Sequence, residues 1–197
     1  MRTFWTTLVV SFVAFNMVGC AKKQPSPTEQ VQTSKEQVTQ EATTSPTAKV
    51  AYAIVEVDGK GTFIIELNLE KAPKTAGNFI KLAEQGFYNG LTFHRVEPNF
   101  VVQGGDPNGN GTGGPGYTIA FEETGLKHED GAVAMARRGD DKNSAGSQFY
   151  ICLGPQHQLD GEYAVFGKVI EGMDVVRKIQ RYDIMRQVSI TYEKPKP

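Results

Sequence analysis

The residues best suited to chemistry lie close together in residues 91 to 106, which hold a permanent cation and an amide among apolar side chains. We expect two short strands there, joined by a turn at Glu97-Pro98-Asn99, because proline and asparagine favour turns. If the strands pair side by side, Arg95 and Gln103 meet on one surface, with Phe100 in an apolar floor beside them. Such a surface offers hydrogen-bond donors and a hydrophobic hollow, but no nucleophile and no acid–base pair.

Alternation along a strand assigns the neighbours of Arg95 to two faces. Phe93, Arg95 and Glu97 are expected to share the face that carries the chemistry, and His94 and Val96 the opposite face. We therefore expect His94 to be a packed, hydrogen-bonded histidine and not a general base.

Three blocks of sequence, taken in order, are similar to one enzyme family. They are Phe93-His94-Arg95-Val96 with Phe100 and Gln103-Gly104-Gly105-Asp106, then Gly146-Ser147-Gln148-Phe149-Tyr150-Ile151, then Leu159-Asp160-Gly161 with Val165-Phe166-Gly167-Lys168-Val169. Together, across residues 50 to 192, they resemble the signature of the cyclophilins, the peptidyl-prolyl cis/trans isomerases.

The resemblance implies a role for each member of the site. Arg95 and Gln103 would be catalytic, Gln103 by orienting Arg95 or by donating to the substrate backbone. The main chain at Ala136 and Arg137 would pair with the residue before proline. The substrate-binding set implied in this way is Phe100, Val101, Ala136, Arg137, Tyr150, Leu159 and Tyr163.

Two pocket residues depart from the family pattern. Val101 stands where methionine is common, so the proline pocket should be a little shallower. Tyr150 stands where phenylalanine is usual, and its hydroxyl then needs water or a polar partner.

An arginine suits this chemistry for a physical reason. A peptide bond resists rotation with a barrier of about 18–20 kcal/mol, and at the twisted transition state the proline nitrogen regains a lone pair. A donor aimed at that nitrogen binds the transition state better than the planar ground state. Arg95 stays protonated and offers several donors in a rigid fork. The reaction requires no cofactor and no metal, and we expect neither.

The elements that must position these residues are mostly strands. Asp58-Gly59 between two β-rich runs predicts a hairpin, and Pro73 followed by apolar residues at helical spacing predicts a helix that Gly86 ends. The expected elements are strands at 51–57, 62–69, 131–135, 148–153, 163–169 and 188–192, a helix from 73, and a second helix marked by Met173, Val176 and Ile179.

Many antiparallel strands with two widely separated helices indicate a mainly β domain whose sheet closes into a barrel with covered ends. The resemblance implies the specific version, a closed eight-stranded antiparallel β-barrel capped by two α-helices, cyclophilin-like. In that fold the binding groove lies on the outer wall.

The N-terminus predicts export. Arg2 precedes an apolar run from residue 4 to 17 that is shorter than the roughly 20 residues of a membrane span, as in a secretory signal. Met17-Val18-Gly19-Cys20 resembles a bacterial lipobox, in which the cysteine is acylated and becomes the first residue. We expect a lipoprotein signal peptide at 1–19 and a lipid on Cys20 that anchors the chain in the bacterial cell envelope, on the extracytoplasmic side of a membrane. The alternative is an ordinary signal peptide with an incidental cysteine.

Composition divides the remaining chain into two parts. Residues 20–49, rich in Lys, Gln, Pro, Ser, Thr and Glu without an aromatic residue, are predicted to be a disordered tether behind the lipidated Cys20. A helix over 28–42 lacks any apolar stripe. Residues 50–197 form the expected isomerase domain.

Charge and cysteine content restrict the partners. A formal net charge of -1 argues against nucleic acid, which usually requires a clustered basic face. Cys152, the cysteine left if Cys20 is lipidated, lies in an apolar strand and is expected to be a buried, inert thiol. We expect a monomer that binds proline-containing polypeptides and reaches the membrane only through its lipid.

Two motifs that suggest other chemistry are set aside. The run 109–114 satisfies G-x-G-x-x-G, but Pro115 and Gly116 follow where a helix must begin, so no dinucleotide site is predicted. His128, Glu129 and Asp130 are adjacent in a loop, where three ligands rarely converge on a metal, and are expected to be exposed to solvent.

The sequence therefore favours an exported prolyl isomerase that assists the folding of secreted proteins, because uncatalysed isomerisation takes tens of seconds or more. A second hypothesis is a binding module that holds proline-containing segments without useful turnover. The intact set of Arg95, Phe100 and Gln103 argues against it. A third, a β-barrel carrier of lipophilic ligands, lacks support, because the motif residues point outward in the resembling fold.

Overall fold

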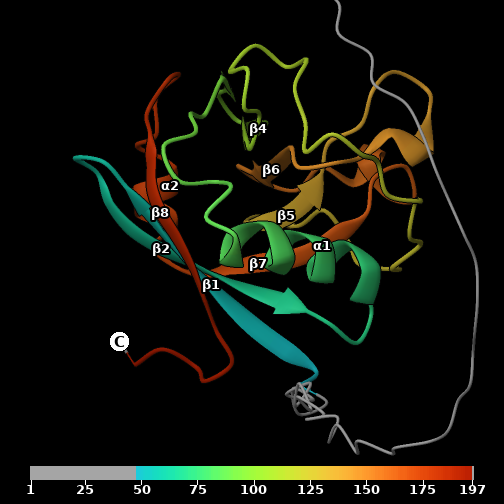
Figure 1. Cartoon of the computed structure of the whole chain (residues 1–197), viewed down its shortest axis with the longest axis horizontal. Helices are drawn as coiled ribbons and strands as arrows, with labels where there is room; N and C mark the ends of the chain where they lie inside the picture. The colour runs from blue at the N-terminus through green and yellow to red at the C-terminus, as the bar shows by residue number, and fades with distance from the viewer. Residues whose placement is uncertain (1–47, 197) are drawn as a thin grey trace, which may run out of the picture. The chain divides into compact units, whose positions relative to one another are not determined.

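The computed structural model describes residues 48–196, which hold eight strands, two α-helices and two short 3-10 helices (Figure 1). The predicted signal peptide, Cys20 and all but the end of the predicted tether lie outside the described residues. Within them, no helix is long and apolar enough to cross a membrane. The elements are β1 (Val50–Val57), β2 (Gly61–Asn68), α1 (Pro73–Glu84), β3 (Arg95–Glu97), β4 (Val101–Gly104), β5 (Ala132–Met135), η1 (Lys142–Ser144), β6 (Phe149–Cys152), η2 (His157–Leu159), β7 (Val165–Glu171), α2 (Met173–Val176) and β8 (Met185–Thr191).

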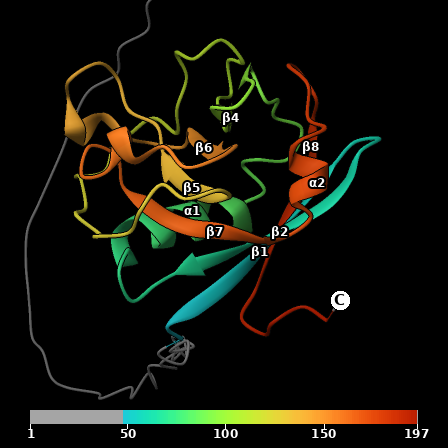
Figure 2. The same cartoon turned by 180° about the vertical axis from the view of Figure 1, so that it is seen from behind.

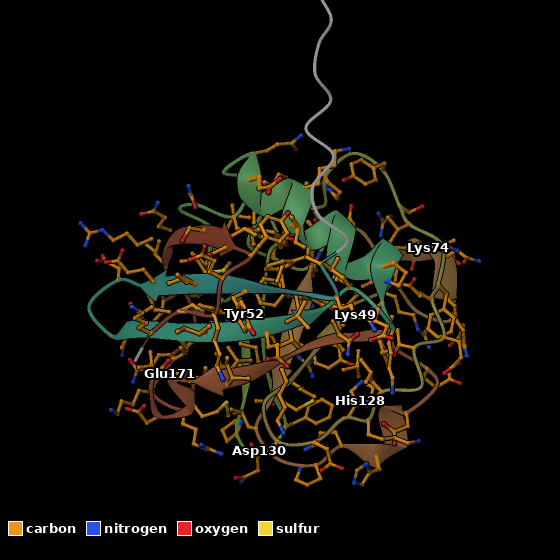
Figure 3. The ribbon with its side chains drawn as sticks, turned by 90° about the horizontal axis from the view of Figure 1, so that it is seen from below. Lys49, Tyr52, Lys74, His128, Asp130 and Glu171 are labelled. Carbon is orange, nitrogen blue, oxygen red and sulfur yellow. The ribbon has the colours of Figure 1, made fainter. Side chains whose placement is uncertain are left out.

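The first hairpin forms as the sequence predicts. β1 and β2 pair antiparallel with Val57 opposite Gly61, and Gly59 in the turn between them has a φ of 66°, which glycine adopts without strain. Every second residue of β1 is buried. Figure 3, which views the domain from below, shows Tyr52 on this hairpin, at one of the positions of β1 that alternate with the buried ones.

The eight strands form one antiparallel sheet in the order β3-β4-β6-β5-β7-β2-β1-β8. The sheet curls around the core, so that β1, β2 and β8 lie on one side and β4, β5 and β6 on the other (Figures 1 and 2). In the described residues, β3 and β8, the two edge strands of the sheet, form no ladder with each other. An isolated bridge between Thr92 and Ile184 joins their neighbourhoods. The fold is therefore a strongly curled, open eight-stranded sheet, and the expected complete closure of the barrel is not seen.

Helix α1 follows the predicted pattern. Pro73 lies in its first turn, and its buried face, which includes Phe79 and Leu82, packs against β8, β2 and β7. The chain leaves the helix through Gly86, whose φ is 70°.

Helix α2 is shorter than the predicted segment. The backbone bond from Arg177 N–H to Met173 C=O is helical, but Lys178 N–H and Ile179 N–H bond three residues back, so the chain tightens after one turn. Ile179 is still buried, which explains why the apolar spacing extended beyond the helix.

Alternation on β4, β5 and β6 divides their side chains between two apolar clusters. One is the core inside the curl, with Val102, Val133, Met135, Phe149 and Ile151. The other, which we call the outer cluster, lies on the opposite face and contains Val101, Ala132, Ala134, Tyr150, Cys152 and Val165. The implied groove on the outer wall therefore has an apolar base of its own.

Cys152 belongs to this outer cluster and is fully buried, as expected. Burial is the main cause that raises the pKa of its thiol to about 12, so it stays protonated at neutral pH and is inert.

The prediction that Phe93 shares a face with Arg95 is wrong. Phe93 is fully buried in the inner core, whereas the side chain of Arg95 is 44% exposed. The reason is that β3 begins only at Arg95, so strand alternation does not extend back to Phe93.

Candidate active site

The β3–β4 hairpin brings the cation and the amide together, as the sequence predicts. Arg95 and Gln103 are directly paired across the two strands. The turn is closed by a hydrogen bond of 3.0 Å from Phe100 N–H to Glu97 C=O, and Asn99 has a φ of 60°. A proline followed by a residue with positive φ is typical of a type II turn.

The guanidinium of Arg95 lies on the rim of a hollow. Its Nη1 donates to Gln103 Oε1 over 3.3 Å, and its Cζ lies 5.5 Å from the centre of the Phe100 ring. Its Nε is 3.6 Å from Glu97 Oε1, with both side chains about half exposed. An exposed pair of this kind contributes only about 0–1 kcal/mol. Arg95 is therefore not withdrawn into a structural ion pair.

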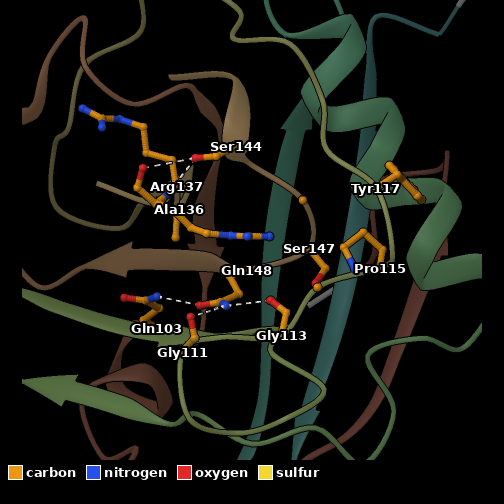
Figure 4. Close-up of a pocket in the computed structure, with 13 residues that line it drawn as sticks. Gln103, Gly111, Gly113, Pro115, Tyr117, Ala136, Arg137, Ser144, Ser147 and Gln148 are labelled. Carbon is orange, nitrogen blue, oxygen red and sulfur yellow. Dashed lines mark hydrogen bonds between the residues drawn. The ribbon is translucent and has the colours of Figure 1, made fainter. Parts of the chain in front are cut away.

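A chain of amides orients Gln103. Its Nε2 donates to Gln148 Oε1 over 3.0 Å, and Gln148 Nε2 donates to the carbonyls of Gly111 and Gly113 over 3.0 and 2.9 Å (Figure 4). Because the NH₂ group of Gln103 is used in this way, its oxygen faces Arg95. Gln148 belongs to one of the blocks that resemble the cyclophilins, but the sequence alone indicates no role for it.

Asp106 holds the glycine-rich loop that supplies those carbonyls. Its buried carboxylate accepts hydrogen bonds from the main-chain N–H groups of Asn108, Asn110 and Gly111. Burial alone raises the pKa of Asp106, but these three donors outweigh it and bring the pKa below its ordinary value. The G-x-G-x-x-G run is thus a loop that positions the amides, and no helix follows it.

All nine residues that were predicted to be catalytic or substrate-binding line one hollow of about 240 Å³. They come from β3, the turn between β3 and β4, β4, β6, η2 and the segments after β5 and before β7. The lining residues are Arg95, Phe100, Val101, Gln103, Ala136, Arg137, Tyr150, Leu159 and Tyr163.

The side chain of Arg137 is held in the wall of the hollow by contacts on two sides. Its Nη2 lies 3.2 Å from Glu162 Oε2, and its Cζ lies 4.6 Å from the centre of the Tyr163 ring. In residues 48–196, the main-chain N–H and C=O of Arg137 form no hydrogen bond. They are therefore open to a peptide that runs along this edge, which is the role the resemblance implies.

A second, smaller hollow of about 80 Å³ adjoins the first (Figure 4). The two share Gln103, Ala136 and Arg137, and the second continues past Ser147 and Pro115. The site is thus an elongated groove with a wide and a narrow part, which suits an extended chain better than a compact ligand.

The expectation that His128 is exposed is wrong. Its side chain is fully buried, with Nε2 2.9 Å from the hydroxyl of Tyr150 and Nδ1 2.9 Å from Asp160 Oδ1. His128 is thus the polar partner that Tyr150 was predicted to need. Asp130, by contrast, is 43% exposed and pairs with Arg177 over 2.6 Å.

His94 is buried, as expected, and does not line the hollow of the nine predicted residues, although it borders a separate hollow together with Arg95. The expectation that its side chain is hydrogen-bonded is wrong: its carbonyl accepts from Arg181 Nε over 2.9 Å, but its buried ring Nδ1 has no hydrogen-bond partner among the described residues. Burial is the main cause that lowers the pKa of His94, so the ring is neutral at neutral pH.

The fold and the site thus combine a curled antiparallel sheet with a half-exposed cation on the rim of a groove on its outer face. Residues 52–195 match the model of the family described as cyclophilin-type peptidyl-prolyl cis-trans isomerase/CLD. The chain belongs to this family, and its enzymatic class is peptidyl-prolyl cis-trans isomerase.

Relatives and solved structures of similar proteins match about three quarters of the chain. Peptidyl-prolyl cis-trans isomerase B of Bacillus subtilis is 49% identical over 144 residues, which cover 72% of this chain and 98% of the relative. A crystal structure of a cyclophilin-type isomerase from Cryptosporidium parvum is similar with a TM-score of 0.68 at 30% identity, covering 74% of this chain and 99% of that one. A second crystal structure of that protein, in the presence of the dipeptide Ala-Pro, is similar with a TM-score of 0.63 at 29% identity, covering 73% and 99%.

Proposed function

We propose that the chain catalyses isomerisation of X-Pro bonds with Arg95 as the catalytic donor, over the hollow as the proline pocket. The observation that carries this proposal is the convergence of the nine predicted residues on one hollow, with a half-exposed guanidinium on its rim. The proline ring would occupy the apolar floor formed by Phe100, Val101 and Tyr150, and proline-containing polypeptides are the substrates.

In this mechanism the fork of Arg95 divides its donors. One N–H bonds Gln103, which fixes the plane of the guanidinium, and other N–H groups point toward the substrate. As the amide twists, the proline nitrogen becomes pyramidal and accepts a hydrogen bond that the planar ground state does not offer. Because this bond exists only near the transition state, it accelerates the reaction instead of tightening ground-state binding.

The test is a protease-free isomerisation assay with an Ala-Pro peptide, which compares the purified wild-type chain with Arg95→Ala. Acceleration by the wild type and loss of activity in the variant support the proposal. A wild type that binds the peptide but does not accelerate the reaction would support the holding module instead.

The mechanism predicts activity that is nearly independent of pH. Burial lowers the pKa of both His94 and His128 below the ordinary value of 6.5, so each becomes charged only in more acidic solution. Arginine stays charged throughout, and kcat/KM should therefore vary by less than about twofold between about pH 6.5 and 8. A bell-shaped profile measured in this range would point to a titrating acid or base and contradict the mechanism.

We further propose that the enzyme works outside the cytoplasm, as a monomer anchored by a lipid on Cys20, and assists the folding of exported proteins. The support is the sequence of residues 1–20, which has the order of a lipoprotein signal.

Cell fractionation of a bacterial expression host tests the anchor. The wild-type chain should be recovered with membranes and incorporate labelled palmitate. The Cys20→Ala chain should incorporate no palmitate, and it should either appear in the soluble fraction or keep its signal peptide uncleaved. Two acyl chains are enough for stable anchoring, so the change should be nearly complete. Equal palmitate labelling of Cys20→Ala would rule out this cysteine, and Cys152→Ala is the matched control.

A further inference from the structure

A fully buried histidine lies directly behind the proline pocket. The hydroxyl of Tyr150, a pocket residue, is 2.9 Å from His128 Nε2, and His128 Nδ1 is 2.9 Å from Asp160 Oδ1. The rings of Tyr150 and His128 are within 14° of parallel, with centroids 6.0 Å apart. None of the steps proposed for Arg95 uses this histidine.

The hydrogen bonds determine which nitrogen carries the proton. Asp160 is an ionised acceptor, because burial raises its pKa but the hydrogen bonds from His128 and Lys127 outweigh that effect and bring the pKa far below the ordinary value. His128 therefore donates through Nδ1–H, and its neutral ring accepts at Nε2. Tyr150 must then be the donor, so its hydroxyl hydrogen points to His128 and away from the proline hollow.

The same histidine ties two walls of the pocket together. Its main-chain N–H donates to Asp160 Oδ1 over 2.9 Å, and its carbonyl accepts from Gln156 N–H over 2.7 Å. Asp160 directly follows Leu159, which lines the same hollow as Tyr150 of β6. In Figure 3, His128 lies in the segment that precedes β5.

We propose that His128 is a positioning residue, which holds the Tyr150 ring against the segment that carries Leu159 and turns the tyrosine hydroxyl out of the proline pocket. This inference rests on the proposed function, because it takes the hollow as the site of the proline ring. It explains how a tyrosine can stand in place of an apolar ring: its hydroxyl is held by His128, so Tyr150 presents only ring carbons to the substrate.

The charged and titratable groups that face His128 are few. Asp160 accepts from it, Lys127 Nζ and His157 Nδ1 each lie 3.4 Å from Asp160 Oδ2, and Tyr150 donates to it. Loss of the ring therefore leaves the Tyr150 hydroxyl without an acceptor in a buried place.

A kinetic cycle with a proline peptide tests the inference. His128→Leu should raise KM about 5- to 10-fold, as expected when a buried hydroxyl loses its hydrogen-bond partner, with kcat within about twofold of the wild type. Adding Tyr150→Phe to His128→Leu removes the stranded hydroxyl and should return KM to within about twofold of the wild type. His157→Leu, which removes an exposed histidine of the same neighbourhood, is the control and should change neither constant.

The rescue separates positioning from a general structural role. If His128 only stabilised the fold, removing the hydroxyl of Tyr150 would not restore KM. An unchanged KM in His128→Leu, or a raised KM that persists in the double variant, would overturn the inference. Neither result would affect the proposed function, which fails instead if wild type and Arg95→Ala are equally inactive.

A measurement that does not depend on His128→Leu folding uses NMR of the imidazole nitrogens. Wild-type His128 should show the Nδ1–H tautomer at neutral pH, and its titration should move to higher pH in Tyr150→Phe. The reason is that the tyrosine O–H stabilises the neutral ring, and its removal makes protonation easier. An Nε2–H tautomer, or identical titration in both proteins, would contradict the proposed arrangement.

Discussion

Replacing Arg95 by alanine is expected to lower kcat/KM for an Ala-Pro peptide by about 10- to 150-fold, because a hydrogen bond from a charged group is worth about 1.5–3 kcal/mol and each 1.36 kcal/mol is tenfold in rate. Most of the loss should fall on kcat, since the bond to the proline nitrogen forms only as the amide twists. Stability should change little, because the side chain is 44% exposed and its ion pair to Glu97 is long.

Two further variants separate charge, fork and general surface effects. Arg95→Lys keeps the charge but loses the planar fork that bonds Gln103 and substrate together, so it should recover only part of the activity. Arg186→Ala removes another exposed arginine that pairs with a carboxylate, Glu56, on β1, and should leave kcat/KM unchanged. A wild-type rate in Arg95→Ala would remove Arg95 from the mechanism.

Local patterns predicted the part of the site that is local in sequence. The turn at Pro98 and Asn99 fixes which residues of β3 and β4 face each other, and register then follows from the pleat. The meeting of Arg95 and Gln103 could therefore be predicted from the residues alone. The convergence of Tyr150 and Leu159 on the same hollow could not, because it depends on pairing across the whole sheet, and only the family resemblance indicated it.

The errors have physical causes as well. His128 was placed in solvent because adjacent polar residues in a loop are usually exposed, and nothing local shows that Tyr150 and Asp160 arrive from elsewhere to bond both ring nitrogens. The role of Gln148 cannot be predicted from the sequence for a similar reason. Its function depends on the carbonyls of a loop whose conformation is set by Asp106.

The expected closed barrel shows the limit of fold analogy. Strand number and antiparallel pairing agree with the prediction, but closure depends on whether the last few residues of two end strands reach each other. Here β3 has three residues and begins at Arg95, so the segment before it meets the chain near Ile184 through an isolated bridge and a few backbone hydrogen bonds, such as Phe93 N–H to Asp183 C=O, and not through a ladder. The short β3 also explains why Phe93 is free to enter the core.

Gly105→Ala is expected to lower the free energy of unfolding by about 3–5 kcal/mol, the range of severe single substitutions. Gly105 follows β4 with a φ of 81°, and an added Cβ would lie 2.5 Å from the carbonyl oxygen of Ser147 and 3.1 Å from the rings of Phe149 and Tyr88. Backbone on one side and buried rings on the other leave no room to relax. Urea unfolding followed by circular dichroism measures the change.

Gly59→Ala is the matched control for Gly105→Ala. Gly59 has a similar φ of 66°, but an added Cβ there meets nothing within 4 Å, so only the left-handed backbone strain of about 1–2 kcal/mol remains. The free energy of unfolding that Gly105→Ala loses beyond the loss in Gly59→Ala then measures how tightly the chain after β4 packs against Ser147. The hydroxyl of Ser147 donates to Gly105 C=O over 2.7 Å. Because Gln103 lies two residues away, the activity of Gly105→Ala should fall even where the variant is folded. Equal losses of unfolding free energy in Gly105→Ala and Gly59→Ala would show that the chain does not pack tightly against Ser147.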